Sequence, residues 1–355
     1  MSYDASETLC EQISTHLANQ QAIQICAGGS KDFYGRKVLS EAVPVDVTVH
    51  HGIVHYEPTE LVITARCGTA LSTIETTLAE HGQMLAFEPP YFGDKATLGG
   101  CVASGLSGPR RPFAGATRDS VLGIKLINGR GNLIQFGGEV MKNVAGYDVS
   151  RLMTGSLGTL GVITDVSLKV LPKPVQDMTL VYEMPANTAI KHINTLCAQP
   201  HPITATCFDG DKLLVRLSGH HAAIKTAHTQ LGGEVLDDNG AYWHGLREQT
   251  LGFFQSDKPL WRLSIAPNTP PIELEGKQLI EWRGAQRWLF SDLPAEQVRQ
   301  KVASLGGHAT LFRHNTANDD IFHPLEGKLH ELHLNLKLAM DPNCLFNPGR
   351  MYPDF

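Results

Sequence analysis

Apolar residues recur at helical spacing near both ends of the chain. Leu9, Ile13 and Leu17 stand four positions apart, which predicts an amphipathic helix over residues 6–20. A last helix is expected over 324–340, where a following Asp-Pro pair ends it because proline cannot continue a helix.

Short apolar runs bounded by turn residues predict the strands of the first half. Two of these runs flank a Pro-Thr pair and predict an antiparallel strand pair, and two flank an Asn-Gly-Arg-Gly segment and predict a hairpin. The expected strands cover residues 22–26, 53–57, 61–65, 121–127, 132–136 and 162–170.

Two local motifs predict how elements begin or turn. Ser72 and Glu75 have capping-box spacing, so they are expected to start a helix that runs to His81. Asn128-Gly129 suits a type I′ turn, which we expect in the hairpin.

The pair Pro172 and Pro174 is the best candidate for a domain boundary. Beyond it, three β-α-β units of similar size predict a ferredoxin-like α/β domain, single or duplicated. The strands are expected at 179–183, 203–208, 213–217, 233–236, 287–291 and 309–313, and the helices at 189–197, 222–231 and 294–305.

Size and charge place the chain among globular proteins of roughly two domains. The 355 residues carry a formal net charge of −6 without a basic stripe, which argues against a nucleic-acid partner. The chain has neither an apolar run of about 20 residues nor the charge pattern of a signal peptide, so a cytoplasmic protein is expected. Seven scattered cysteines without a Cys-x-x-Cys pair favour reduced, structural thiols over an iron–sulfur cluster or zinc ribbon.

Three glycine-rich loops carry the main chemical signal. They are residues 26–31, 97–103 and 155–161, and each lies at the edge of an apolar strand-like run. Because glycine has no Cβ, such loops let a ligand approach backbone N–H groups, which predicts a long anionic cofactor. A Rossmann site and a P-loop are excluded, since neither Gly-x-Gly-x-x-Gly between strand and helix nor Gly-Lys-Ser/Thr occurs.

Five motifs in order resemble the FAD-binding domain of the vanillyl-alcohol oxidase (PCMH-type) flavoproteins. They are Ala27-Gly-Gly-Ser30, Thr97-Leu-Gly-Gly-Cys-Val-Ala103, Asp119-Ser-Val-Leu-Gly123, Gly155-Ser-Leu-Gly-Thr-Leu-Gly161 and the terminal Asp341-Pro342 with Phe346-Asn-Pro-Gly-Arg350. Three further stretches resemble the FAD-binding subunits of bacterial glycolate oxidases (glycolate dehydrogenases). These are Ser107-Gly-Pro-Arg-Arg-Pro112, Val140-Met-Lys-Asn-Val-Ala-Gly-Tyr-Asp-Val-Ser-Arg151 and Glu281-Trp-Arg-Gly-Ala-Gln-Arg-Trp288.

The resemblance implies an α+β fold: a two-subdomain PCMH-type FAD-binding domain over 1–175, a ferredoxin-like α/β cap over 176–323, and a helix and tail over 324–355 that return to the first domain. Many relatives bind FAD covalently through a histidine after the Gly-Gly pair. Ser30 stands there, so the FAD is expected to be non-covalent. The residues expected to bind FAD are Gly28, Gly29, Ser30, Lys31, Thr97, Leu98, Gly99, Gly100, Ala103, Arg110, Asp119, Gly158, Gly161, Val162 and Ile163.

Two of those roles come from the family. The backbone of Val162 and Ile163 would pair with the adenine edge, and Asp119 would cap the loop before its strand. The resemblance also implies a complex that oxidises glycolate to glyoxylate, with a larger FAD-containing catalytic subunit and an iron–sulfur subunit. Electrons would then reach quinone, with the complex peripheral on the inner face of the membrane. A stand-alone FAD-dependent 2-hydroxy-acid or alcohol dehydrogenase and a non-catalytic docking subunit are the alternatives.

Several arginines are candidates for binding the carboxylate of the substrate. A 2-hydroxy acid needs a cation for its carboxylate, and arginine suits that role through bidentate pairing. The candidates are Arg110, Arg111, Arg262 and Arg283, and no catalytic base can be singled out. Prolines and a glycine bracket Arg110 and Arg111, so we expect this pair to face the cofactor or a partner.

Two further features have competing interpretations. His323, Glu326, His330 and His333 share a helix face with metal-like spacing, but a solvent-facing stripe is favoured and no metal is expected. The stretch 281–288 either shapes a site or docks a partner, and its Trp and Arg residues favour docking.

Overall fold

The structure is a computed structural model and describes residues 2–138, 147–313 and 321–355. Most of the stretch 140–151 therefore lies outside the described residues. The chain divides into two compact units. Unit 1 holds Met1–Leu106, Ala116–Pro172 and Thr316–Phe355, and unit 2 holds Ser107–Gly115 and Lys173–Asn315. The segment Ser107–Gly115, expected in the first domain, belongs to unit 2.

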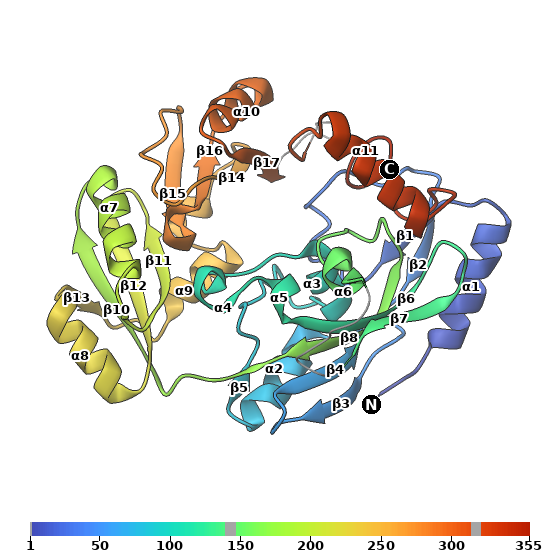
Figure 1. The fold of residues 1–355 in the computed structure, drawn as a ribbon, viewed down its shortest axis with the longest axis horizontal. Coiled ribbons are helices and arrows are strands. Elements are labelled where there is room, and N and C mark those ends of the chain that lie inside the picture. The colour runs from blue at the N-terminus through green and yellow to red at the C-terminus, as the bar shows by residue number, and fades with distance from the viewer. Residues whose placement is uncertain (1, 139–146, 314–320) are drawn as a thin grey trace. The chain divides into compact units, whose positions relative to one another are not determined.

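Unit 1 is built from a parallel strand pair and a larger antiparallel sheet (Figure 1). The pair joins β1 (Ile23–Cys26) to β2 (Val43–Asp46). The sheet has the order β3-β4-β8-β6-β7, with β3 Ile53–Glu57, β4 Val62–Arg66, β8 Val162–Lys169, β6 Val121–Ile127 and β7 Leu133–Gly137. A small ladder pairs β5 (Gln83–Met84) with β9 (Leu171–Pro172).

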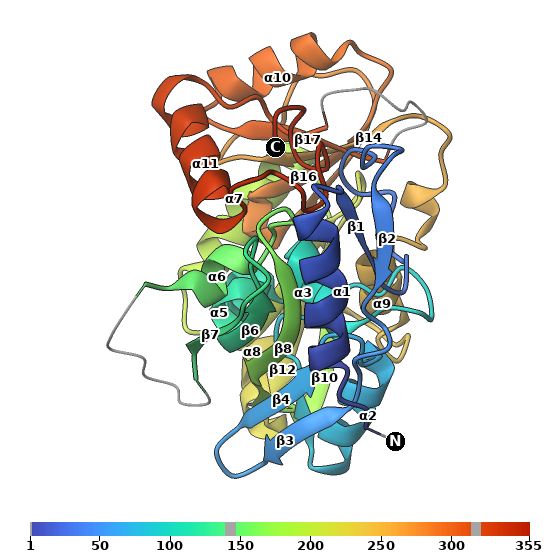
Figure 2. The ribbon, with the colours of Figure 1, turned by 90° about the vertical axis from the view of Figure 1, so that its right-hand side faces the viewer.

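The helices of unit 1 pack around these two sheets. They are α1 (Ser6–Ala18), α2 (Leu71–Glu80), α3 (Leu98–Ser104), α5 (Thr117–Ser120), α6 (Val149–Met153) and α11 (Gly327–Met340). Figure 2 faces α1, whose apolar residues Leu9, Ile13 and Leu17 join one core with residues of both sheets. The helical periodicity at the start of the chain is therefore confirmed.

Two local predictions in unit 1 are wrong. The helix α2 has Ala70 as its N-cap, so Ser72 lies inside it. The N–H of Leu71 donates to the carbonyl of Ala96, so a tertiary contact satisfies a group that a cap would serve. The β6–β7 hairpin is confirmed, but of its turn residues only Gly131 has a positive φ (77°), which excludes a type I′ turn.

The end of the chain returns to unit 1 and pairs with its first strand. Ile23 and Phe346 form a parallel bridge, and the N–H of Asn347 donates to the carbonyl of Ile23. Lys337 of α11 is fully buried and forms an ion pair with Asp341 at 2.7 Å. These contacts fix the tail against β1.

Unit 2 contains an eight-stranded antiparallel sheet of order β13-β10-β12-β11-β15-β16-β14-β17. Its first half comprises β10 (Gln176–Glu183), α7 (Ala186–Cys197), β11 (Ile203–Phe208), β12 (Lys212–Gly219), α8 (His221–Leu231) and β13 (Glu234–Leu236). In chain order these four strands lie as 4-1-3-2, which is the ferredoxin-like arrangement. The helices α7 and α8 pack on the sheet around a core that includes Ile193 and Ile224 (Figure 1).

The second half repeats this order in an incomplete form. It comprises β14 (Leu260–Ser264), β15 (Lys277–Glu281), β16 (Gln286–Phe290), α10 (Ala295–Ser304) and β17 (His308–Arg313). The copies meet where β11 pairs with β15, and no helix stands between β14 and β15 in the described chain. The ferredoxin-like cap is thus confirmed and duplicated. The sequence pattern missed β14, β15 and the helix α9 (Ala241–Glu248).

Candidate functional site

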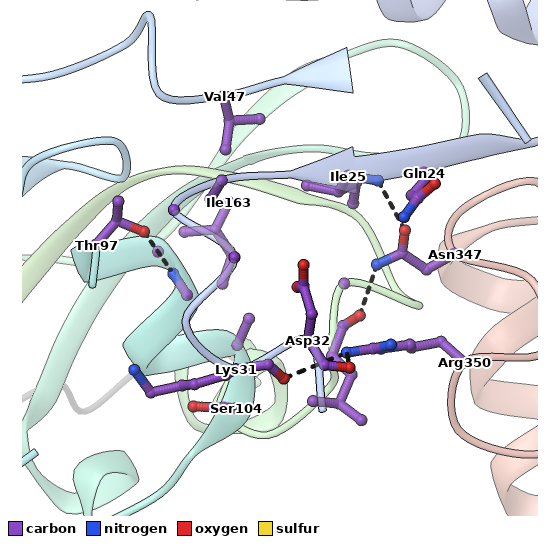
Figure 3. Close-up of a pocket in the computed structure, with 18 of the residues that line it drawn as sticks. Gln24, Ile25, Lys31, Asp32, Val47, Thr97, Ser104, Ile163, Asn347 and Arg350 are labelled. Carbon is purple, nitrogen blue, oxygen red and sulfur yellow. Dashed lines mark hydrogen bonds between the residues drawn. The ribbon is translucent and has the colours of Figure 1, made fainter. Parts of the chain in front are cut away.

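A cavity of about 400 Å³ lies in unit 1, where the glycine-rich loops meet the C-terminal tail (Figure 3). This volume is within the usual range for ligand sites. Its lining residues are Gln24, Ile25, Ala27, Gly28, Gly29, Ser30, Lys31, Asp32, Lys37, Val38, Val47, Cys67, Thr97, Gly99, Gly100, Ala103, Ser104, Leu157, Gly158, Gly161, Ile163, Asn347 and Arg350. The structure therefore brings together most residues that the sequence singled out.

The first loop presents open backbone donors to this cavity. The N–H groups of Gly28, Gly29 and Ser30 donate to no acceptor within the described part of the chain. Gly29 has a φ of 70°, a left-handed conformation that favours glycine, and its carbonyl accepts the N–H of Asp32 in the turn that follows. Three consecutive N–H groups around such a turn form a concavity suited to an anion. We call Gly28–Ser30 the cradle.

The charges on the cavity wall also favour an anion. Its lining carries the three cations Lys31, Lys37 and Arg350, against the single carboxylate of Asp32. The Lys31 ammonium donates to Ser30 Oγ and to the Tyr91 carbonyl, each at 3.2 Å, and so lies next to the cradle. Wall charge and open donors together suit a phosphate-bearing ligand.

The second loop differs, because its donors are already used. The N–H of Leu98 donates to the Thr69 carbonyl and that of Gly99 to the Cys67 carbonyl at 2.7 Å. The Gly100 N–H reaches Thr97 Oγ1 at 3.3 Å, which caps α3. Contrary to the expectation from sequence, Gly99 and Gly100 do not add a second set of open donors.

Gly99 is instead required by packing. A Cβ at this position would lie 2.7 Å from the Cβ of Cys67, closer than side chains approach one another. Burial raises the pKa of the Cys67 thiol to about 12, so it lines the cavity as a neutral apolar group.

The third loop is held by the tail. A Cβ at Gly158 would lie 2.6 Å from Asn347 Nδ2, which donates to the Leu157 carbonyl at 2.7 Å. Asn347 Oδ1 accepts the N–H of Ile25 at 2.8 Å, so one side chain joins the third loop to β1 (Figure 3). The sequence singled out the terminal motif but did not assign Asn347 or Arg350 to the site, because their partners stand more than 300 positions away.

Four predicted FAD residues do not line the cavity. Leu98 and Val162 are buried in the core of unit 1. Asp119 Oδ2 accepts the N–H of Ala116 at 2.9 Å, which caps the short helix before β6. Arg110 belongs to unit 2, so its expected part in FAD binding stays a prediction.

The two adjacent arginines have defined contacts within unit 2. Arg110 is buried and donates to Ser218 Oγ at 3.3 Å, with Asp177 at 3.9 Å. The Arg111 guanidinium stacks over the Trp282 ring at 4.3 Å. Both side chains therefore join the segment Ser107–Gly115 to the rest of unit 2.

The other two arginine candidates also belong to unit 2. The Arg262 guanidinium lies 6.0 Å from the centre of the Phe312 ring, and that of Arg283 lies 5.9 Å from the centre of the Phe113 ring. Neither arginine lines the cavity of unit 1.

The stretch 281–288 is mostly internal, which disagrees with the docking interpretation. Glu281 is buried, and its Oε1 accepts the indole N–H of Trp288 at 2.7 Å and an amide N–H of Gln286. Arg287 is fully buried and donates to the carbonyls of Gly284 and Thr269, both at 2.8 Å. These residues hold the β15–β16 hairpin together and offer little surface to a partner.

The histidines of the last helix take separate partners. His330 Nε2 lies 2.6 Å from Asp354 Oδ2, and His333 Nδ1 lies 2.8 Å from the Leu329 carbonyl. The described residues contain no group of three or more His, Cys, Asp or Glu that could hold a metal ion. Among the same residues, no helix combines the length and apolar character needed to cross a membrane.

Known proteins match both the whole chain and its first part. The Escherichia coli K12 protein "Glycolate oxidase subunit GlcE" is 47% identical over 351 residues, which is 99% of this chain and 98% of that protein. The model of the family "FAD binding domain" matches residues 7–137. The chain belongs to the GlcE family of FAD-binding proteins.

Two further relatives match a little under half of this chain. "D-lactate dehydrogenase" of Anaerostipes hadrus is 31% identical over 49% of this chain and 38% of that protein. "Glycolate oxidase subunit GlcD" of Bacillus subtilis is 34% identical over 43% of this chain and 33% of that protein. Both names describe oxidoreductases that act on hydroxy acids.

A solved structure extends the match to the whole fold. An alkyldihydroxyacetonephosphate synthase superposes with a TM-score of 0.68 over 96% of this chain and 75% of its own, at 15% identity. At that identity the likeness shows the fold alone, and it confirms the PCMH-type architecture.

The cavity residues of this GlcE-family chain fit FAD. A pyrophosphate needs convergent N–H donors and nearby positive charge, and the cradle with Lys31, Lys37 and Arg350 provides both. The cradle also needs its glycine, since a Cβ at Gly28 would collide with the Lys95 carbonyl.

Proposed function

We propose that this chain is the FAD-binding subunit of a complex that oxidises glycolate to glyoxylate. The observation that carries the proposal is the cavity of unit 1, with its open cradle and positively charged wall, in a chain that aligns end to end with a glycolate oxidase subunit. Bound FAD would take a hydride from the carbon that bears the hydroxyl group of a 2-hydroxy acid.

The FAD is held without a covalent bond in this proposal. Ser30 is the last residue of the cradle, and its hydroxyl group does not attach to the flavin as a histidine side chain does. The cradle, Lys31 and Lys37 would hold the pyrophosphate, and the backbone at Val162 and Ile163 would meet the adenine. Ile163 lines the same cavity, which supports this placement.

The chain acts with companion subunits. Two relatives, GlcE and GlcD, are named as different subunits of glycolate oxidase, which supports a complex with a larger flavoprotein. We further propose an iron–sulfur subunit that takes the electrons toward quinone, which places the complex in the cytoplasm on the inner face of the membrane. The substrate-binding arginines and the base stay unassigned.

The spectrum of the purified chain tests cofactor binding first. A yellow protein with flavin absorbance whose colour passes into the supernatant after acid precipitation supports non-covalent FAD. A colourless protein that takes up no added FAD contradicts the proposal. Flavin that stays in the pellet contradicts the non-covalent part alone.

Dye reduction with glycolate then tests the assignment as a subunit. We expect little turnover by the flavin-loaded chain and strong turnover after its companion subunits are added. Equal turnover by the single chain and the complex would instead establish a stand-alone dehydrogenase. A control with D-lactate separates glycolate from longer 2-hydroxy acids.

A further inference from the structure

The C-terminal Asn-Pro-Gly-Arg motif holds the cradle at both of its ends. Upstream, Asn347 Oδ1 accepts the N–H of Ile25, which lies in β1 shortly before the cradle. Downstream, Arg350 donates to carbonyl groups of the segment that follows the cradle. Within the described residues the N–H groups of the cradle donate to no acceptor, so these two anchors hold the backbone on either side of it.

The Arg350 guanidinium contacts backbone carbonyl groups along the six-residue segment 31–36. Its Nη1 donates to the Arg36 carbonyl at 2.7 Å, and its Nη2 donates to the Tyr34 carbonyl at 2.8 Å. The carbonyls of Asp32 and Lys31 lie 3.3 and 3.5 Å from Nη2. A backbone hydrogen bond joins the same two residues, since the N–H of Arg36 donates to the Arg350 carbonyl at 2.9 Å.

This guanidinium has no acidic partner among the described residues. Burial lowers its pKa, and the nearby Asp32 carboxylate partly opposes that shift. A cation that is paired only with carbonyl dipoles keeps its positive field, and Arg350 lines the cavity. The side chain therefore anchors the loop and leaves its charge next to the anion site.

We propose that Arg350 is a positioning residue for FAD: it fixes the segment after the cradle so that the N–H groups of Gly28–Ser30 stay turned toward the pyrophosphate. The inference rests on the proposed function, and it concerns the geometry of the same site. Only arginine suits this role, because its planar fork spreads five donors over several acceptors, whereas a lysine ammonium is a single point.

The test compares Arg350→Met and Arg350→Lys with Lys37→Met. Lys37 lines the same cavity, so its substitution removes an equal charge without touching the carbonyl anchor. FAD affinity is measured on the purified chain by flavin fluorescence, ADP serves as a pyrophosphate probe without flavin, and riboflavin serves as a probe without pyrophosphate.

We expect both Arg350 variants to weaken FAD and ADP binding by about tenfold or more, as lost charge-assisted hydrogen bonds do. Riboflavin binding should stay unchanged. Lys37→Met should weaken FAD binding by less than about fivefold, as for an exposed charge. The ³¹P signals of bound FAD should move in the Arg350 variants, which a purely structural role would not cause.

Several outcomes overturn the inference. Wild-type affinity in Arg350→Lys together with a loss in Arg350→Met shows that charge alone matters. Wild-type FAD affinity in both variants would show that Arg350 has no role in FAD binding. Loss of the folded state in both would show that Arg350 stabilises the fold and is not specific to FAD binding. If the wild-type chain binds neither FAD nor ADP, the proposed function fails instead.

Discussion

Two Gly-Gly pairs, Gly28-Gly29 and Gly99-Gly100, line the same cavity but have different structural roles. At the first pair, the N–H groups of Gly28 and Gly29 are open. At the second pair, the Gly99 N–H is bonded to the Cys67 carbonyl, and a Cβ there would press on the Cys67 side chain. The first pair is thus suited to bind a ligand, and the second lets α3 pack closely. A glycine pair in a sequence predicts close approach, but it does not say what approaches.

The two loops also differ in what holds them. The first loop depends on the tail, through Asn347 and Arg350, whereas the second is fixed by neighbouring backbone in unit 1. Variants that loosen the tail should therefore affect the first loop alone, and variants at the second loop should affect folding. The following predictions run from the largest expected change in stability to the smallest.

Removal of the buried cation that anchors the tail should have the largest effect. Lys337 Nζ donates to Asp341 and to the carbonyls of Thr159 and Phe346, and Lys337→Met would leave the Asp341 carboxylate buried and unpaired. We expect a loss of about 3–5 kcal/mol in unfolding free energy, measured by urea titration without FAD. The control Lys328→Met, exposed on the same helix, should change it by less than about 0.5 kcal/mol. A loss below about 1 kcal/mol for Lys337→Met would contradict the role of the tail.

Gly99→Val should damage the fold before it affects the cofactor. The new side chain would press on Cys67 behind α3, and overpacking of this kind costs about 1–3 kcal/mol. We expect a lower melting temperature of the apo-protein. An apo-protein with wild-type melting that no longer binds FAD would show that Gly99 faces the ligand, as the sequence alone suggested.

Gly29→Ala should weaken the cradle through backbone strain. Gly29 has a φ of 70°, and the left-handed conformation costs a residue with a Cβ about 1–2 kcal/mol. Gly82→Ala is the matched control, because Gly82 has a φ of 63° and open space around its Cβ position. Both variants should lose similar stability, and only Gly29→Ala should lose FAD affinity. An equal loss of FAD affinity in both would contradict a special role of the cradle.

Gly100→Ala should separate ligand binding from folding. Alanine is favoured over glycine in a helix by about 0.5–1 kcal/mol. Among the described residues, and outside its own helix backbone, the new Cβ would have one atom within 4 Å, Thr97 Oγ1 at 3.3 Å. The apo-protein should be as stable as wild type or slightly more so. The methyl group on the cavity wall should still lower FAD affinity, measured by fluorescence titration. Unchanged affinity would mean that the ligand does not approach α3.

The sequence predicted those elements whose residues interact locally. The spacing of Leu9, Ile13 and Leu17 defined α1, and the glycine loops indicated the cavity before any geometry was known. The capping box failed because the Ala96 carbonyl, distant in sequence, accepts the N–H of Leu71. Long-range contacts decide such cases, and a local pattern does not contain them.

The same limit explains what was missed in the site and in unit 2. Asn347 and Ile25 are 322 positions apart, so no spacing links them. The five-residue strands β14 and β15 are stabilised by pairing with β16 and other neighbours, and a run so short has no clear period. In the stretch 281–288, buried hydrogen bonds use the Trp and Arg groups that suggested an interface.

The most direct test of the account follows the glycine amides when the cofactor is added. The chain is labelled with ¹⁵N-glycine, and the amide signals are assigned with Gly29→Ala, Gly100→Ala and similar single variants. On titration with FAD, and with ADP as the pyrophosphate probe, the Gly28 and Gly29 signals should shift downfield as their N–H groups gain an acceptor. The Gly99 signal should hardly move, because its N–H is already bonded to Cys67. A large shift of Gly99 with unmoved signals of Gly28 and Gly29 would contradict the account.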